Sequence, residues 1–187
     1  MNQHNYKVSS PSHYDLGYKI LHWLMAILIF LMFFAVEGFA SITSIDEHMV
    51  MLIGHSSIGT VISILLIMRM SKRFIIKSKR PIHDLNQWQK NVSKVVHIAL
   101  YFCMALIPLS GYLAARAHEL PVKLFGTFNL SQTQVSGFDK TYFETLRLVH
   151  ELGIKLIFIL LTLHIGAVLY HKFIRKDQVL SAMTKNK

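Results

Sequence analysis

Four long apolar segments dominate the 187-residue sequence, and each carries at least one histidine. The segments cover residues 17–39, 48–70, 93–115 and 147–172. Each is close to the length of about 20 residues that an α-helix needs to cross the hydrocarbon core of a bilayer. They predict an all-α membrane protein, and the links between them favour an up-down-up-down four-helix transmembrane bundle. One domain covering residues 1–187 is expected, because no repeat or low-complexity tract divides the chain.

The last apolar segment carries two histidines, His150 and His164, that are fourteen residues apart. Fourteen residues are close to four helical turns, so the two imidazoles share one helix face and are separated by about 21 Å along the axis. In a hydrocarbon core roughly 30 Å thick, one imidazole then lies near each edge. His22 and His97 on other segments lie near one of these depths, and His55 lies near the other. Two b-type hemes stacked across a membrane would need this arrangement.

The depths of the histidines predict how they pair. His55 and His150 both lie near the outer starts of their segments, so they can face each other across an outer heme. His22 and His164 lie towards the inner ends and can bracket an inner heme. His97 lies at a similar inner depth, so a pair of His22 with His97 stays open as the alternative. We prefer His164 because it shares a helix face with His150, which would stack two hemes along one helix.

Histidines inside a membrane have a simpler interpretation as well. A single one often only hydrogen-bonds a neighbouring helix. Polar residues at this depth are nevertheless costly, and several at matched depths favour ligation of a metal. Cys103 is the only cysteine, and the sequence has neither a CxxC nor a CxxCH motif. A covalently attached c-type heme is therefore not expected, and any heme must be held by axial histidines and non-covalent contacts.

Two further residues are candidates for contact with a heme. Arg69 is fourteen residues after His55, hence on the same helix face and at the inner level, where its guanidinium can pair with a heme propionate. It can equally serve as a positively charged anchor at the membrane surface. Arg147 is the analogous outer candidate. Gly59 lies one turn beyond His55, where a missing side chain would either admit a flat macrocycle or allow a close contact between helices.

The formal net charge of +10 would by itself be compatible with nucleic-acid binding. Most of the 20 Lys and Arg residues, however, lie in the N-terminal segment, the second connection and the C-terminal tail, whereas the first connection has none. This asymmetry predicts that both termini are cytoplasmic and that basic side chains lie near anionic lipid. No basic motif interleaved with aromatic residues points to nucleic acid. Residues 1–19 are polar and no cleavage site follows, so no removed signal peptide is expected.

Residues near the two membrane surfaces give weaker indications. The outer connection, residues 116–146, is the best candidate for a cap or binding surface, with a turn predicted at 136–139. His171 lies two turns after His164, where it could contact a quinone head group as proton donor or acceptor, or be an ordinary interfacial histidine. Lys155 lies about 180° from His164 around the helix and is expected to miss the heme face. No role is assigned to five other histidines: His4, His13, His48, His83 and His118.

Several short segments resemble the bacterial cytochrome b-561 family. They are Ile20-Leu21-His22-Trp23-Leu24, Gly54-His55-Ser56-Ser57-Ile58-Gly59 and Val149-His150-Glu151, together with His164, His171 and Lys176-Asp177. The resemblance extends over all four apolar segments. It implies a four-helix inner-membrane protein with two hemes, whose axial ligands are His22, His55, His150 and His164. It also implies exchange of electrons with ubiquinone, and some members oxidise superoxide at the periplasmic side.

The leading functional hypothesis is an oxidoreductase of the superoxide:quinone type, in which an electron enters at the outer heme, crosses to the inner heme and reduces ubiquinone. Four basic residues near the outer surface could attract a small anion such as superoxide: Arg116, Lys123, Lys140 and Arg147. Three acids in the same region oppose this: Glu119, Asp139 and Glu144. One alternative is a heme b electron-transfer subunit docked to a dehydrogenase or hydrogenase. A second is a non-heme transporter that uses the same histidines.

Overall fold

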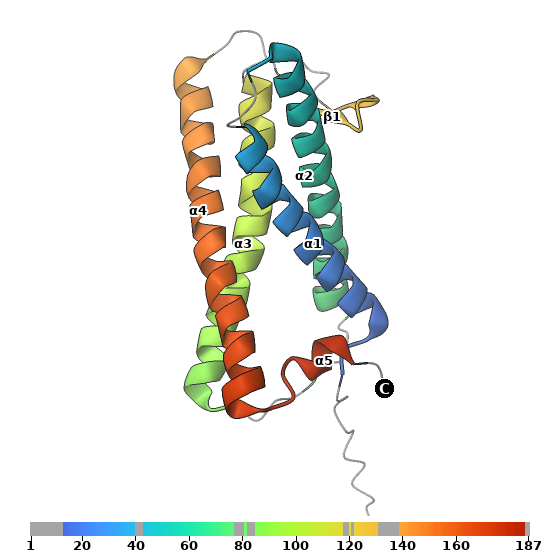
Figure 1. The fold of residues 1–187 in the computed structure, drawn as a ribbon, viewed down its shortest axis with the longest axis vertical. Coiled ribbons are helices and arrows are strands. Elements are labelled where there is room, and N and C mark those ends of the chain that lie inside the picture. Colours follow the sequence, from blue (N-terminus) through green and yellow to red (C-terminus); the bar gives the residue numbers. More distant parts are fainter. Residues whose placement is uncertain are drawn as a thin grey trace, which may run out of the picture.

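The computed structural model is built from four long helices (Figure 1). It describes residues 13–39, 43–76, 81, 85–117, 120, 122–130 and 139–185. The long helices are α1 (Leu16–Phe39), α2 (Ile45–Phe74), α3 (Gln87–Ala117) and α4 (Lys140–Tyr170). Each is long and apolar enough to cross a membrane. The predicted all-α, four-helix membrane architecture is therefore confirmed.

The helices alternate in direction, so the bundle has two distinct ends. At one end, called here the terminal end, α1 begins and the short helix α5 (Ser181–Thr184) lies near the C-terminus (Figure 1). At the opposite end, called here the hairpin end, strands β1 (Lys123–Leu124) and β2 (Phe128–Asn129) form an antiparallel hairpin. The helices α2 and α4 run from the hairpin end to the terminal end, and α1 crosses the bundle obliquely (Figure 1).

The helices extend further than the apolar segments. Whereas the sequence predicted starts at residues 93 and 147, α3 begins at Gln87 and α4 at Lys140. An apolar stretch marks only the part of a helix that lies in lipid, and polar residues can continue the same backbone hydrogen bonds into the interface. Asp139 caps α4 by accepting a hydrogen bond from the Tyr142 N–H at 3.0 Å. The rest of the turn predicted at 136–139 lies outside the described residues.

Two apolar clusters hold the helices together. One joins α1 to α2 and contains Leu21, Met25, Leu65 and Leu66. The other joins α3 to α4 and contains Leu100, Cys103, Ile157 and Leu160. In the second cluster the helices approach closely at Gly153, where an added Cβ would lie 2.9 Å from Ile107 Cγ1. Small residues allow this kind of contact between membrane helices, where packing rather than the hydrophobic effect drives association.

Segments outside the long helices are fastened to the bundle by hydrogen bonds that the sequence did not predict. At the hairpin end, the Ser57 hydroxyl on α2 accepts the Phe125 N–H at 2.8 Å and lies 3.0 Å from the Lys123 carbonyl oxygen. At the terminal end, the chain continues from α4 through the π-helix η1 (His171–Arg175) and returns to α1. There the Trp23 Nε1–H donates to the Met183 carbonyl oxygen at 3.2 Å. These contacts connect both ends of the bundle to the helices that carry histidines.

Candidate functional site

Two histidines face each other at the hairpin end, one on α2 and one on α4. The ring centroids of His55 and His150 are 6.2 Å apart, and the ring planes make an angle of 62°. His150 Nδ1 lies 2.8 Å from the Ile107 carbonyl oxygen of α3, to which it donates as an N–H. This hydrogen bond leaves the lone pair on Nε2 available, which is the arrangement that commonly orients a metal-ligating histidine.

A glycine on α3 makes room for the His150 imidazole. A Cβ added at Gly111 would lie 2.9 Å from His150 Cε1 and 3.0 Å from its Nδ1. Any larger residue would therefore displace the ring. The position of His150 is thus set by two neighbours on α3, the Gly111 backbone and the Ile107 carbonyl group.

Three histidines meet at the terminal end. The ring centroids of His22 and His164 are 6.4 Å apart, with an angle of 75° between the ring planes. His97 on α3 also contacts His164, with a centroid separation of 5.2 Å. His97 Nδ1 lies 2.6 Å from the Ser93 carbonyl oxygen. The structure therefore brings together the three histidines that the sequence placed at the inner depth.

The spacing of the imidazoles can be compared with the spacing expected of two imidazoles bound to one metal. When two imidazoles bind one metal from opposite sides, each metal–nitrogen bond is about 2.0 Å long, and each ring centroid lies roughly 1 Å beyond its nitrogen. The two centroids are then roughly 6 Å apart. The separations of 6.2 Å for His55–His150 and 6.4 Å for His22–His164 fit an iron atom between the rings. The separation of 5.2 Å for His97–His164 is short for this purpose.

Gly59 lies one turn from His55 and makes no close contact with another helix in the described part of the chain. A Cβ added there would meet no heavy atom within 4 Å. The interpretation of Gly59 as a close helix contact is therefore wrong, and this role falls to Gly111 and Gly153 instead. The open space beside Gly59 is compatible with a flat macrocycle next to the His55–His150 pair.

Arg69 on α2 is buried at the terminal end, with only 8% of its surface exposed. Its guanidinium lies over the Tyr18 ring, with Cζ 4.6 Å from the ring centroid, and its Nε–H donates to the Tyr101 hydroxyl at 3.1 Å. Its Nη1 has no hydrogen-bond partner among the described residues, so it can donate to an anionic group. The two tyrosines were not predicted from the sequence. Tyr18 is four residues before His22 and Tyr101 four after His97, and this spacing of one helical turn is the signal that could have identified them.

The match to known proteins agrees with this geometry. A family model for prokaryotic cytochrome b561 matches residues 13–186. The chain belongs to the prokaryotic cytochrome b561 family. Cytochrome b561 homolog 2 of Escherichia coli K12 is 27% identical over 177 residues, which cover 94% of this chain and 93% of the relative. Cytochrome b561 homolog 1 of the same organism is 24% identical over 165 residues, which cover 87% and 92%.

Family membership confirms the resemblance and fixes the broad activity. This cytochrome b561 is a multi-pass bacterial membrane protein that transfers electrons across the membrane with b-type heme. The alternative of a non-heme transporter receives no support from the match. The imidazole pairs with roughly 6 Å spacing are the groups on this chain that fit the axial positions of a heme.

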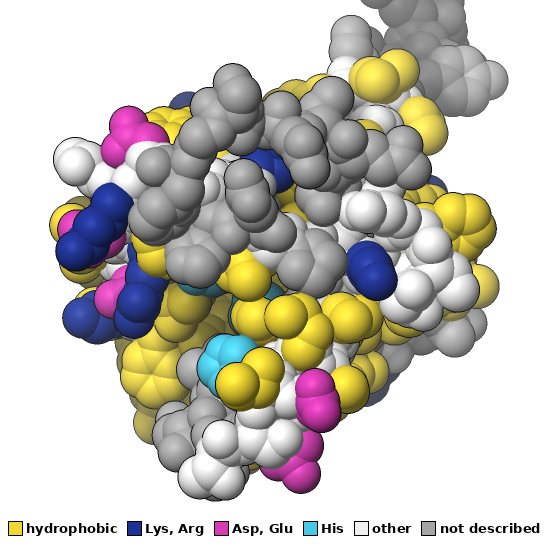
Figure 2. Space-filling model, turned by 90° about the horizontal axis from the view of Figure 1, so that it is seen from above, with side chains coloured by type: hydrophobic (Ala, Val, Ile, Leu, Met, Phe, Trp, Pro, Cys, Tyr) yellow, Lys and Arg dark blue, Asp and Glu magenta, His cyan; other side chains and the backbone are white. Residues whose placement is uncertain are grey.

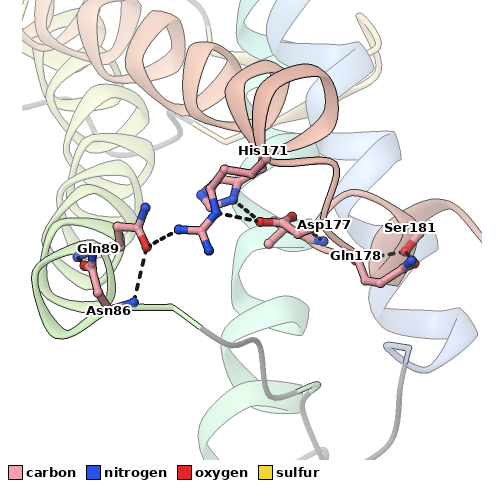
Figure 3. A network of polar contacts seen from close by, with 8 residues as sticks. Asn86, Gln89, His171, Asp177, Gln178 and Ser181 are labelled. Carbon is pink, nitrogen blue, oxygen red and sulfur yellow. Dashed lines mark hydrogen bonds and ion pairs between the residues drawn. The ribbon is translucent and has the colours of Figure 1, made fainter.

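His171 begins η1 at the terminal end, where it is held by Asp177, a residue that the sequence indicated only as part of the family resemblance. His171 Nδ1 lies 2.5 Å from Asp177 Oδ2 (Figure 3). Arg175 Nε lies 3.4 Å from the same oxygen, and Arg175 Nη1 donates to Gln89 Oε1 of α3 at 2.9 Å. Partial burial opposes ionisation of Asp177, but the hydrogen bonds from His171 and the Val179 N–H, with the charge of Arg175, hold the pKa of its carboxyl below the usual range.

The charged residues at the hairpin end are mostly exposed and of mixed sign. Arg147 Nε pairs with Glu151 Oε1 at 2.9 Å, and Lys140 Nζ lies 3.8 Å from Glu144 Oε1. Figure 2, which looks onto this end, shows basic and acidic side chains beside one another along one side. Lys155 lies on an exposed face of α4. Arg147 is thus engaged in a surface ion pair, and its contact with an outer heme stays a prediction.

Proposed function

We propose that this cytochrome binds two b-type hemes, one between His55 and His150 and one between His22 and His164. The observation that carries the proposal is the pair of centroid separations, 6.2 and 6.4 Å, which both fit two axial imidazoles on one iron. Arg69, with its buried Nη1, would donate to a propionate of the terminal-end heme. The hemes supply the one-electron redox chemistry, and the chain binds and orients them.

The number of hemes is tested with the pyridine hemochrome assay on purified protein. Two hemes per chain are expected, and His150→Ala and His164→Ala should each reduce this to one. The remaining heme should have a different absorption spectrum in the two variants, because a different pair remains in each. A reproducible value of one heme in the unaltered protein would contradict the proposal.

The terminal end is proposed to face the cytoplasm. The proposal rests on the excess of Lys and Arg near both termini and in the second connection, compared with the first connection. The orientation is tested with reporters fused after residue 187. A reporter active only in the cytoplasm should function there, and one that is active only in the periplasm should not. The reverse result would invert the direction of electron transfer proposed below.

The proposed path runs from a periplasmic donor through the hairpin-end heme to the terminal-end heme and then to ubiquinone. His171 would contact the quinone head group, since its ring lies at the terminal end of α4 and Asp177 holds its Nδ1. With Nδ1 so occupied, Nε2 is the nitrogen that can exchange a proton with a quinone oxygen. Asp177 is therefore a positioning residue for His171.

Superoxide is proposed as the donor, and a partner dehydrogenase or hydrogenase is the second candidate. The basic residues at the hairpin end support an anionic donor, although two of them are paired with acids. The two candidates are separated by stopped-flow absorbance at the α band, with superoxide as the only donor. Heme reduction above that in heat-inactivated protein is expected. No reduction would favour a protein donor, and this cytochrome would then need that partner for turnover.

A further inference from the structure

The buried positive charge of this cytochrome is concentrated at one end. Among the described residues, the buried charged side chains are Lys19 and Arg69, and both lie at the terminal end. Lys19 is three residues before His22, and its Nζ donates to the Lys185 carbonyl oxygen. No carboxylate pairs with Arg69 in the described part of the chain. The contacts of Arg69 are therefore with neutral tyrosines, so that no carboxylate of the described chain offsets its charge.

Arg69 is held close to the terminal-end histidines by two aromatic residues. Tyr18 and Tyr101 lie one helical turn from His22 and His97, and Arg69 contacts both tyrosines. These contacts hold the guanidinium beside residues that lie one helical turn from His22 and His97. Because the guanidinium is buried, solvent screens its charge less than it would at the surface.

The hairpin-end pair has a different electrostatic environment. The charged residue next to His150 is Glu151, whose side chain is 47% exposed and paired with Arg147. The two charges are opposite and face solvent, so their combined effect on His55 and His150 is small. Arg116 and Lys123 also lie at the hairpin end, but both are only partly buried. The terminal end differs in having the buried guanidinium of Arg69.

We propose that Arg69 gives the terminal-end heme a higher reduction potential than the hairpin-end heme, so that electrons move towards the terminal end. This inference rests on the proposed function, in which each pair holds a heme. A nearby positive charge favours the reduced state because reduction adds one negative charge to the centre. The transfer is a one-electron exchange in which one iron is oxidised from ferrous to ferric as the other is reduced. Tyr101 is a positioning residue, because its hydroxyl accepts the hydrogen bond from the Arg69 Nε–H and so fixes the guanidinium.

The inference is tested by potentiometric titration of the α band in purified, heme-loaded protein. Two one-electron waves are expected, and the higher one should be the wave that remains in His150→Ala. Arg69→Gln should lower the midpoint potential of this wave by about 59 mV or more. For a one-electron couple this is a tenfold change in the equilibrium constant for electron transfer between the two hemes. The hairpin-end wave should not move. Arg69→Lys, which keeps the charge, should retain most of the difference.

Arg73→Gln is the matched control, because Arg73 lies one turn beyond Arg69 on the same helix and also contacts the Tyr101 ring. It should shift the terminal-end wave less than Arg69→Gln does. If Arg69→Gln loses its terminal-end heme, Tyr101→Phe is the variant to measure instead. It should lower the midpoint potential of the terminal-end heme and leave that of the hairpin-end heme unchanged. The inference is overturned if the higher wave belongs to the hairpin end, or if these variants move both waves equally or neither. Two hemes with the opposite order of potentials would leave the proposed function intact, whereas fewer than two would contradict that function.

Discussion

The His150 imidazole lies against the backbone of Gly111, so that a Cβ at residue 111 would stand 2.9 Å from His150 Cε1. At this distance the ring has to move, and the hydrogen bond from His150 Nδ1 to the Ile107 carbonyl oxygen moves with it. The helix α3 thus sets the position of a proposed ligand on α4. A residue that touches no heme can therefore decide whether one binds.

Gly111→Ala should lower the heme content from two towards one per chain, with loss at the hairpin end. The effect should occur even though alanine favours a helix over glycine by about 1 kcal/mol. The measurement is the pyridine hemochrome assay together with the spectrum of the remaining heme. Gly166→Ala is the control, because an added Cβ there would meet nothing within 4 Å, and it should keep both hemes. Full heme content in Gly111→Ala would show that the ring adjusts without loss of ligation.

The two histidines that contact each other at the terminal end should respond differently to removal. His164→Ala should lose the terminal-end heme, because its separation of 6.4 Å from His22 fits axial ligation. His97→Ala should retain that heme, since the proposed ligands are His22 and His164, and the 5.2 Å spacing of His97 and His164 leaves little room for an iron atom between those two rings. Absorption spectra of the two purified variants give the answer. Loss of the heme in His97→Ala with retention in His164→Ala would instead establish the pair of His22 with His97.

Asp177→Asn should slow the re-oxidation of reduced heme by a ubiquinone analogue by about tenfold, as expected when the residue that orients a functional histidine is lost. The pKa of Asp177 is held below its ordinary value of 3.8, so its carboxylate is ionised at neutral pH. The contribution of the ionised Asp177 carboxylate to the free energy of unfolding is therefore fully present above pH 3.8. It is lost only as the pH falls through the lower pKa of the folded state. Stopped-flow absorbance at pH 7 measures the rate. Asp46→Asn is the control, because Asp46 is exposed at the hairpin end, and it should leave the rate unaltered. If Asp177→Asn re-oxidises as fast as the unaltered protein, Asp177 has no part in the quinone site.

Much of the fold was predictable because the bilayer imposes a simple rule on the sequence. Apolar segments of spanning length identified all four helices, and the fourteen-residue spacing of His150 and His164 placed one imidazole near each end. The same spacing placed Arg69 at the terminal end. These inferences depend only on helix geometry and the thickness of the membrane, which do not vary with the details of side-chain packing.

The details that were not predicted depend on contacts between segments distant in sequence. Gly111 could be recognised as a ring contact only when α3 and α4 were placed side by side. The bond from Arg69 to Tyr101 likewise joins α2 to α3. Asp177 follows η1 in a polar tail whose path back to α1 has no periodic signal, so its contact with His171 required the structure. Pairing of residues across helices therefore stayed open where several candidates shared one depth, as for His97 and His164.

Neutralising Lys140 and Arg147 together should weaken the dependence of heme reduction by superoxide on salt. Both side chains are more than 60% exposed and lie at the hairpin end. Attraction between exposed charges and a small anion is screened by salt, so the rate in the unaltered protein should fall as ionic strength rises. In the Lys140→Gln, Arg147→Gln double variant, Glu144 and Glu151 lose their partners, and the rate at low salt should fall by several-fold with a flatter salt dependence. Stopped-flow absorbance at several ionic strengths provides the measurement, and Lys185→Gln at the terminal end is the control. A rate that is independent of salt in all three proteins would eliminate electrostatic steering by this surface.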